Sequence, residues 1–134
     1  MFLSVIGTSK IIEKHLESAK KNKFILHSIA TTRGKNTNNL EKIFKDYLFI
    51  NKFSNWKDLY DSTKNIDNMV YLISPRIKET FKIANYFLKN KKKIIVEKPL
   101  STQIKNFETL KNLKQNIFVG YNRVYYNNVQ YLKK

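Results

Sequence analysis

Short apolar runs alternate along this chain with longer stretches whose apolar residues recur every three or four positions. The runs are rich in Val, Ile and Phe and span residues 2–6, 24–30, 48–50, 69–73, 94–96 and 117–119. Continuous apolar runs of this length indicate buried strands, whereas the spacing between them indicates helices with one buried face. Regular alternation of the two predicts a parallel sheet with helices packed against it.

The predicted helices lie between these strands, over residues 10–22, 40–47, 77–88 and 102–114, with a short helix that Ser54 can cap and a last helical segment reaching Lys134. Helical spacing places Ile77, Ile104 and Phe107 on buried faces. Crossovers between parallel strands are right-handed, so helices cover both faces. The fold class is α/β, a doubly wound, Rossmann-like sheet of six strands, and 134 residues make one domain.

The charge of the chain is strongly positive, with 26 Lys+Arg against 10 Asp+Glu and a net charge of +16. Such a balance favours a polyanionic partner, but arginine, whose fork reads bases and phosphates, occurs only at Arg33, Arg76 and Arg123. The abundance of Lys, Asn and Ile indicates a compositional bias of the genome instead. We therefore expect no nucleic-acid partner.

Two features that the sequence lacks bear on the compartment in which the protein works. There is no cysteine, which excludes disulfides and thiolate metal sites. No stretch approaches the roughly 18 apolar residues that span a bilayer. The sequence predicts a cytoplasmic protein without a membrane partner.

A charged turn, Glu97-Lys98-Pro99, follows the apolar run 94–96. Proline cannot donate to a ladder and forces an extended predecessor, so the strand ends there, and Ser101 can cap the next helix. In parallel sheets ligands bind at the carboxyl ends of the strands, which makes this turn a candidate site. Taken alone, the turn is equally an ordinary ion pair beside a proline.

The turn after the first strand reads Gly7-Thr8-Ser9-Lys10-Ile11 and opens a helix. This is the place of a dinucleotide-binding fingerprint, in which glycine permits the sharp turn and the helix N-terminus binds a pyrophosphate. Only the first glycine of the fingerprint is present. Ser9 adds a side chain where the backbone approaches the phosphates, and Ile12 adds bulk at the helix–strand contact.

The end of the second strand usually supplies an acid that binds the adenosine ribose. Here it reads Thr31-Thr32-Arg33, with two hydroxyls and a guanidinium but no carboxylate. This chemistry suits a 2′-phosphate better than a ribose diol, which favours NADP over NAD. The alternative is a polar loop that binds no cofactor.

Taken together, these motifs resemble the Gfo/Idh/MocA family of NAD(P)-dependent, mostly sugar-directed oxidoreductases. The resemblance rests on Gly7, on Ser74-Pro75 after the fourth strand, on the stretch 96–101 and on the stretch 119–123 with Val129-Gln130. It implies a cis Lys98-Pro99 bond and a catalytic role for Lys98, whose ammonium stabilises a developing alkoxide. The resemblance further implies that Glu97 orients the cofactor or Lys98, that Ser74, Pro75 and Arg76 line the nicotinamide side, and that Asn122 or Arg123 lies near the substrate.

The chain also departs from the family pattern. Glu79, Val124 and Asn127 stand where the family usually has His, Arg and Pro. Residues 1–122 match the dinucleotide-binding domain, and 123–134 match the start of the crossover helix toward a substrate domain that is missing. Neither His15 nor His27 replaces the missing acid–base group: both are expected to pack, and no His, Asp or Glu cluster has metal-ligand spacing.

Two functions remain open. The first is the NAD(P)-binding domain of a sugar- or sugar-nucleotide-directed oxidoreductase, truncated and inactive alone unless a separately encoded second domain completes it. The second is a degenerate, non-catalytic Rossmann module that acts in interaction or self-association through the uncovered apolar surface. The lost glycines favour the second function, and retention of Glu97-Lys98-Pro99 favours the first.

Overall fold

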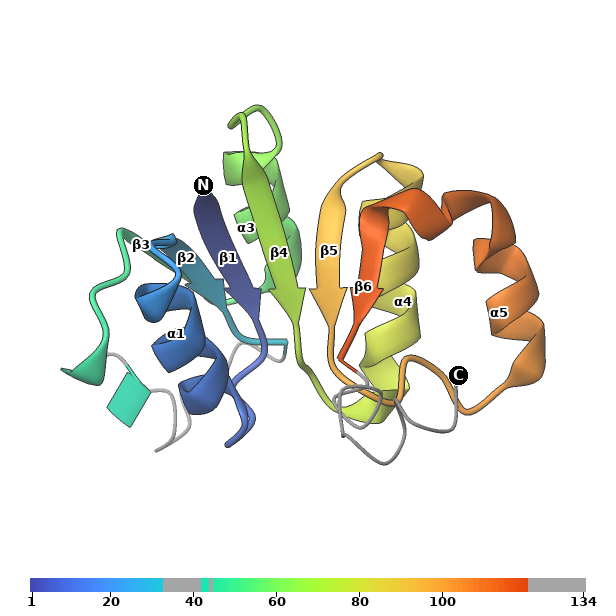
Figure 1. Cartoon of the computed structure of the whole chain (residues 1–134), viewed down its shortest axis with the longest axis horizontal. Helices are drawn as coiled ribbons and strands as arrows, with labels where there is room; N and C mark the ends of the chain where they lie inside the picture. The colour runs from blue at the N-terminus through green and yellow to red at the C-terminus, as the bar shows by residue number, and fades with distance from the viewer. Residues whose placement is uncertain (33–41, 44, 121–134) are drawn as a thin grey trace, which may run out of the picture.

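Six parallel strands form the sheet of the computed structural model, which describes residues 1–32, 42–43 and 45–120. The order across the sheet is β3-β2-β1-β4-β5-β6 (Figure 1), so the chain builds one half outward from β1 and then the other half outward from β4. The predicted doubly wound sheet is therefore confirmed. The strands are β1 (Phe2–Ile6), β2 (Ile25–Ala30), β3 (Asn51–Phe53), β4 (Met69–Ile73), β5 (Lys93–Val96) and β6 (Ile117–Val119).

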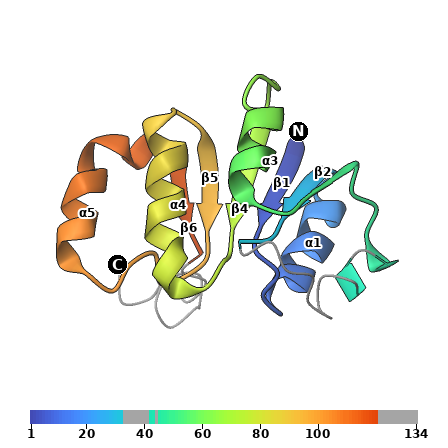
Figure 2. The same ribbon diagram turned by 180° about the vertical axis from the view of Figure 1, so that it is seen from behind.

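Helices cover both faces of this sheet. One face carries α1 (Ile12–Lys21), and the view from behind shows α3 (Trp56–Thr63) and α4 (Ile77–Lys89) on the other (Figure 2). Between β5 and β6 the chain forms α5 (Ile104–Leu110) and a 3-10 segment (Lys111–Asn116). Right-handed crossovers require this division of the helices between the faces.

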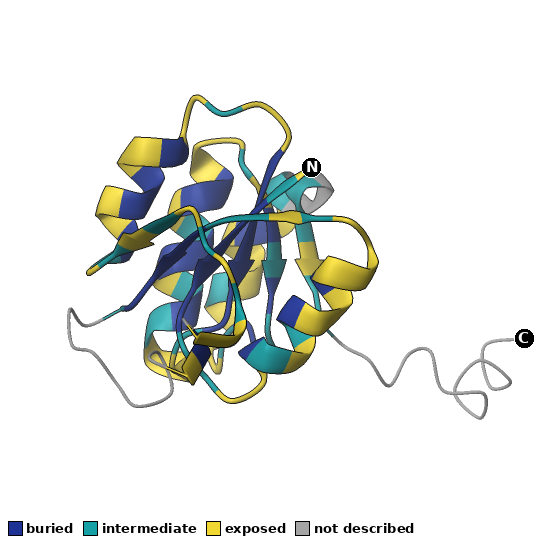
Figure 3. Cartoon of the chain, turned by 90° about the vertical axis from the view of Figure 1, so that its left-hand side faces the viewer, coloured by how far each residue is buried: buried dark blue, intermediate teal, exposed yellow. Residues whose placement is uncertain are grey.

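The hydrophobic core has two parts, one on each face of the sheet. Side chains of α1 pack with Leu3, Val5 and Leu72 on one face, whereas α3 and α4 pack on the other face around Tyr71 and Phe87, whose ring centroids are 4.5 Å apart. β4 is buried along its whole length, and Figure 3 shows buried strands between more exposed helices. Each fully buried large side chain stabilises the fold by about 1.5–3 kcal/mol.

The third strand does not lie where its apolar run predicted. It spans Asn51–Phe53 rather than 48–50, and Leu48 and Ile50 are 92% and 62% exposed. β3 is an edge strand, so its position depends on pairing with β2, in which Ala30 lies opposite Phe53. A short apolar run alone carries no such register information.

Helix ends and faces also differ from the prediction. Asn55, rather than Ser54, caps α3, because its side chain accepts hydrogen bonds from the backbone N–H groups of Lys57 and Asp58. Ile104 and Phe107 are exposed at 84% and 43%, although their spacing placed them inward. α5 is short and buries only Leu110. The other apolar residues of its amphipathic pattern therefore have no surface to pack against.

Further deviations are smaller. Ile77, at the first position of α4, is 43% exposed, while Ala84 and Leu88 of the same predicted face are fully buried. The helix predicted over 40–47 is described only in part: Lys42, Ile43, Lys45 and Asp46 are helical, and Ile43 is fully buried.

Candidate functional site

The turns that follow four strands are joined in a row along the carboxyl edge of the sheet. In each case the N–H of the first turn residue donates to the last carbonyl of a neighbouring strand. These bonds run from Gly7 to Ala30 at 2.9 Å, from Ser74 to Ile6 at 2.8 Å, from Glu97 to Ile73 at 3.0 Å and from Gly120 to Val96 at 2.9 Å. The edge thus brings together Gly7, Ser74 and Glu97, which the sequence assigned to one site.

Gly7 follows β1 directly and lies close to the backbone of Ser74, which follows β4. Its φ is +105°, and a Cβ placed on it would lie 2.3 Å from the backbone O of Ser74. A side chain is therefore excluded both by the conformation and by the space. This close approach marks the point at which the strand order reverses, which is where open α/β sheets bind ligands.

Ser9 replaces the second glycine of the fingerprint, and its side chain is bonded across the edge. Its Oγ lies 2.8 Å from the Oγ of Ser74, so the hydroxyl pair ties the first turn to the end of β4. Ile12, at the place of the third glycine, is fully buried in the core on the α1 side. Both substitutions are thus accommodated by packing or hydrogen bonding.

The Glu97-Lys98-Pro99 turn has the cis Lys98-Pro99 bond that the resemblance implied. The Lys98 N–H donates to Oε2 of Glu97 at 3.1 Å, and the Lys98 side chain is exposed at the edge. Leu100 is buried, which anchors the turn to the core. Ser101 accepts a hydrogen bond from the N–H of Gln103 at 3.0 Å but does not cap α5, whose N-cap is Gln103.

The structure adds His15, which sequence reasoning had assigned to packing. Its Nε2 lies 2.5 Å from Oε1 of Glu97, and the two side chains are 29% and 20% exposed. His15 lies one turn after the start of α1, at the end of that helix nearest the candidate edge. The position of His15 near this edge was the available sequence signal for a role at the site. Its partner, Glu97, is distant in the sequence.

Other predicted residues lie less clearly at the site. The Thr31 hydroxyl donates to the Ser54 carbonyl at 2.6 Å. Thr32, the other hydroxyl residue after β2, is half-buried. Lys10 and Arg76 are exposed at the same edge, and the Arg76 carbonyl accepts the N–H of Glu79 at 2.8 Å. Thr8 and Pro75 are half-buried and Ile11 is exposed, whereas Arg33, Asn122 and Arg123 lie outside the described residues.

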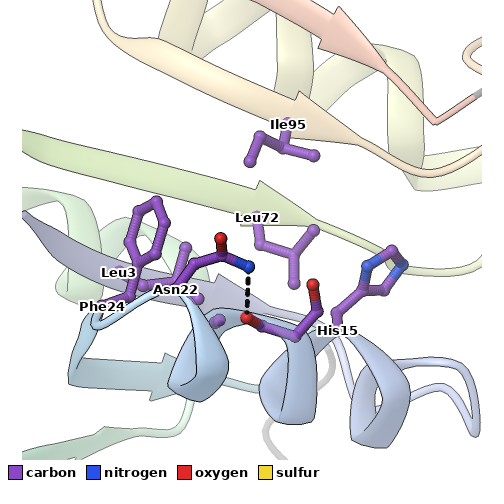
Figure 4. A pocket seen from close by; sticks show the side chains of 8 residues that line it. Leu3, His15, Asn22, Phe24, Leu72 and Ile95 are labelled. Atoms are coloured by element: carbon purple, nitrogen blue, oxygen red, sulfur yellow. Dashed lines mark hydrogen bonds between the residues drawn. The ribbon is translucent and has the colours of Figure 1, made fainter.

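A small hollow lies beside His15, between α1 and the sheet (Figure 4). It measures about 120 Å³, and its walls are mostly apolar. The hollow is too small to hold a dinucleotide. The lining residues are Leu3, His15, Ser18, Ala19, Asn22, Phe24, Leu72 and Ile95.

The described part of the chain has neither a membrane-spanning helix nor a cluster of metal ligands. None of its helices is long and apolar enough to cross a bilayer. It also holds no group of three His, Asp or Glu side chains placed to bind a metal ion.

Solved structures share this fold at low sequence identity. A probable dehydrogenase from Thermotoga maritima is 22% identical with a TM-score of 0.76. The myo-inositol 2-dehydrogenase from Lactobacillus plantarum is 21% identical with a TM-score of 0.77. The WlbA dehydrogenase from Bordetella pertussis, solved with NADH and UDP-GlcNAcA, is 16% identical with a TM-score of 0.77.

Each of these matches covers 99% of this chain but only 40% or 41% of the other chain. At such identities the likeness establishes the fold alone. No curated protein matches the chain. A family model for the oxidoreductase family with an NAD-binding Rossmann fold, GFO_IDH_MocA, matches residues 3–120. The chain therefore belongs to the Gfo/Idh/MocA oxidoreductase family and contains its NAD-binding Rossmann domain.

Proposed function

We propose that this domain binds a nicotinamide dinucleotide along the carboxyl edge of its sheet and serves as the cofactor-binding part of a sugar- or sugar-nucleotide-directed oxidoreductase. The row of strand-end hydrogen bonds carries this proposal, because it aligns Gly7, Ser74 and Glu97 across the point where the strand order reverses. Neighbours whose names include an inositol dehydrogenase and a UDP-sugar complex support this substrate class.

The residues at the edge fit such a cofactor. The turn from Gly7 to Ile11 would hold the pyrophosphate, since no side chain caps the N-terminus of α1 and Lys10 is exposed beside it. Ser74, Pro75 and Arg76 would line the nicotinamide side. Gly7 adds no side chain where it approaches Ser74.

Lys98 is the proposed catalytic residue. When bound, the nicotinamide supplies the hydride chemistry. The exposed Lys98 ammonium would stabilise the negative charge that develops on a substrate oxygen, because a positioned cation lowers the energy of an alkoxide. Glu97 accepts a hydrogen bond from the Lys98 N–H and so holds the backbone of Lys98, as such a role requires.

We further propose a preference for NADP. Thr32 and Arg33 follow β2, and neither is an acid that would bind a bare ribose diol. A 2′-phosphate there would accept hydrogen bonds from a hydroxyl and a guanidinium. Arg33→Ala should then weaken NADPH binding while leaving NADH binding unchanged.

Substrate binding and acid–base catalysis would come from a further domain, on this or another polypeptide, with its crossover beginning near residue 123. The support is that the chain spans about 40% of the length of the solved dehydrogenases. We therefore expect the isolated domain to bind cofactor weakly and to turn over little. Asn122 and Arg123 would lie nearest to the substrate.

A second candidate function is a non-catalytic interaction module. It is favoured by the large apolar side chains exposed on α5 and β6, namely Ile104, Phe107 and Phe118. Sedimentation velocity tests this function: a strict monomer at all concentrations, with no partner domain bound, would count against it.

Isothermal titration with NADPH and NADH tests the leading proposal. We expect a saturable heat with both cofactors, and the stronger one with NADPH. Lys10→Ala should weaken both, since it removes a cation beside the pyrophosphate, whereas Lys89→Ala on the far end of α4 should not. If neither cofactor gives a saturable heat at millimolar concentration, the cofactor-binding proposal is wrong.

A further inference from the structure

We propose that His15 is a positioning residue for Lys98 and acts through the carboxylate of Glu97. The inference rests on the catalytic role proposed for Lys98, and it adds a residue that lies outside every motif used above. The evidence is a chain of two hydrogen bonds that connects α1 with the turn after β5.

The direction of these bonds follows from the chemistry of the groups. An ionised carboxylate only accepts, so the Nε2 atom of His15 carries a proton and donates it to Oε1 of Glu97 across 2.5 Å. The second oxygen, Oε2, is then available for the Lys98 N–H at 3.1 Å. One carboxylate therefore bridges a helix and the backbone of the candidate catalytic residue.

The surroundings of Glu97 leave its side chain dependent on His15. Its own N–H is bonded to the Ile73 carbonyl at 3.0 Å, which fixes the backbone but not the carboxylate. Gly120 lies alongside, where a Cβ would come within 3.4 Å of Oε1, so this neighbour provides room and no hydrogen bond from a side chain. The His15 side chain hydrogen-bonds to this carboxylate and so orients it.

The pair is also shielded enough for the bond to matter. With exposures of 29% and 20%, the side chains of His15 and Glu97 are less accessible to water, which competes for their hydrogen bond, than side chains on an open surface. Hydrogen bonds to an ionised group are shorter and stronger than neutral ones. This bond therefore holds the carboxylate in one orientation rather than in several.

The bridge has a consequence for cofactor binding. α1 begins at Ile12, beside the turn proposed to hold the pyrophosphate, and carries His15 one turn later. The phosphate end of the site and the Lys98 turn are thus joined through one helix and one carboxylate. Removing the His15 donor should change both together: the local environment of the Lys98 N–H and the affinity for the cofactor.

Paired variants separate positioning from packing. His15→Leu removes the donor, whereas His15→Gln places an amide nitrogen near the position of Nε2 and keeps it. His15→Asn serves as a second removal, because its shorter amide does not reach Glu97. His27→Gln is the matched control, since it changes the chain's other histidine, which lies in β2 away from the site.

Two measurements on the full chain are informative. The first is the amide resonance of Lys98 in a 1H–15N correlation spectrum of the cofactor-free protein. The second is NADPH affinity by titration calorimetry. We expect His15→Leu and His15→Asn to shift that resonance and weaken affinity roughly tenfold. His15→Gln should keep both near the values of the unmodified protein, and His27→Gln should change neither.

An unshifted Lys98 amide in both removal variants would overturn the inference. It would also be overturned if His15→Gln behaved like His15→Leu, because that result would indicate packing rather than hydrogen bonding. The Lys98 amide is measured without cofactor. A protein that binds neither NADPH nor NADH would therefore contradict the proposed function while the role of His15 in fixing the Lys98 backbone is still tested.

Discussion

The Nε2 atom of His15 lies 2.5 Å from Oε1 of Glu97, although the two residues are 82 positions apart in the chain. Glu97 also accepts the Lys98 N–H, so its carboxylate takes part in two hydrogen bonds, whereas the Lys98 side chain is exposed. The two neighbouring residues should therefore differ sharply in what they contribute to stability and to function.

Glu97→Ala should lower the free energy of unfolding by about 1–3 kcal/mol, because it leaves the His15 and Lys98 donors without their acceptor. Lys98→Met should change it by less than about 0.5 kcal/mol, since the Lys98 side chain is exposed. Urea unfolding followed by circular dichroism measures both. Equal losses in the two variants would contradict the bridging role of Glu97.

Gly7→Ala should destabilise the protein by about 2–4 kcal/mol, because alanine would be strained in the left-handed conformation and its Cβ would overpack the site. The clash is with backbone, because the added Cβ would lie 2.3 Å from the Ser74 carbonyl oxygen, and a backbone cannot rotate away. Gly120→Ala is the control: its Cβ would come no nearer than 3.4 Å to any atom, so we expect a change below about 1 kcal/mol. Thermal unfolding of the pair distinguishes steric exclusion from a general effect of losing glycine.

Lys91→Gly should stabilise the protein, by about 1 kcal/mol, because left-handed backbone strains any residue with a Cβ. Lys91 has a φ of 56° just beyond α4, where its N–H donates to Leu88 and the N–H of Lys92 donates to Phe87, the pattern of a Schellman motif. Lys89→Gly, within the last turn of α4, should instead destabilise by about 1 kcal/mol. The two variants should change the free energy of unfolding, measured by chemical denaturation, in opposite directions. A change in the same direction would contradict the strain argument.

Burial lowers the pKa of His27 below its ordinary value, because desolvation disfavours the imidazolium. The unfolded chain then binds more protons than the folded one, so stability from the neutral imidazole is present above pH 6.5 and is lost as the pH falls further. His27→Phe, which keeps a ring against Phe2, should reduce the fall in melting temperature between pH 7.5 and 5.5. An unchanged pH dependence would show that His27 is not its source.

Asn55→Ala should cost about 1 kcal/mol, the usual effect of removing an N-cap. Its side-chain oxygen accepts from Lys57 and Asp58 at 2.9 and 3.0 Å. Ser54→Ala should be close to neutral, because the Ser54 carbonyl that Thr31 binds is kept. Comparing the two by urea unfolding tests which residue begins α3.

Local sequence signals predicted the strands that are central or strongly apolar. β1, β2, β4, β5 and β6 were located to within a residue, because their apolar runs are the segments that enter the sheet. β3 was missed by three residues, because the apolar run at 48–50 does not pair with β2 and Leu48 and Ile50 turn outward. Periodicity likewise assigned Ile104 to a buried face that the short α5 does not form.

The candidate site likewise has residues that the sequence could place and contacts that it could not. Gly7 and Glu97-Lys98-Pro99 could be placed at one edge, because each follows a strand directly and all strands are parallel. The His15–Glu97 contact could not be predicted, since it depends on where α1 lies relative to the end of β5 rather than on any spacing along the chain. The Ser9–Ser74 bond was missed for the same reason: two common hydroxyls carry no signal of their pairing.

Each of the four turns at the carboxyl edge is held to an adjacent strand by a hydrogen bond from a peptide N–H. Their positions are therefore inherited from the main chain of the sheet, and Gly7 in addition requires that no side chain be present. Loops taken from dehydrogenases with the same fold could accordingly be transplanted at Gly7, Ser74, Glu97 and Gly120 without redesign of the scaffold. Such chimaeras would make this small domain a template for altering which nucleotide is recognised, one turn at a time.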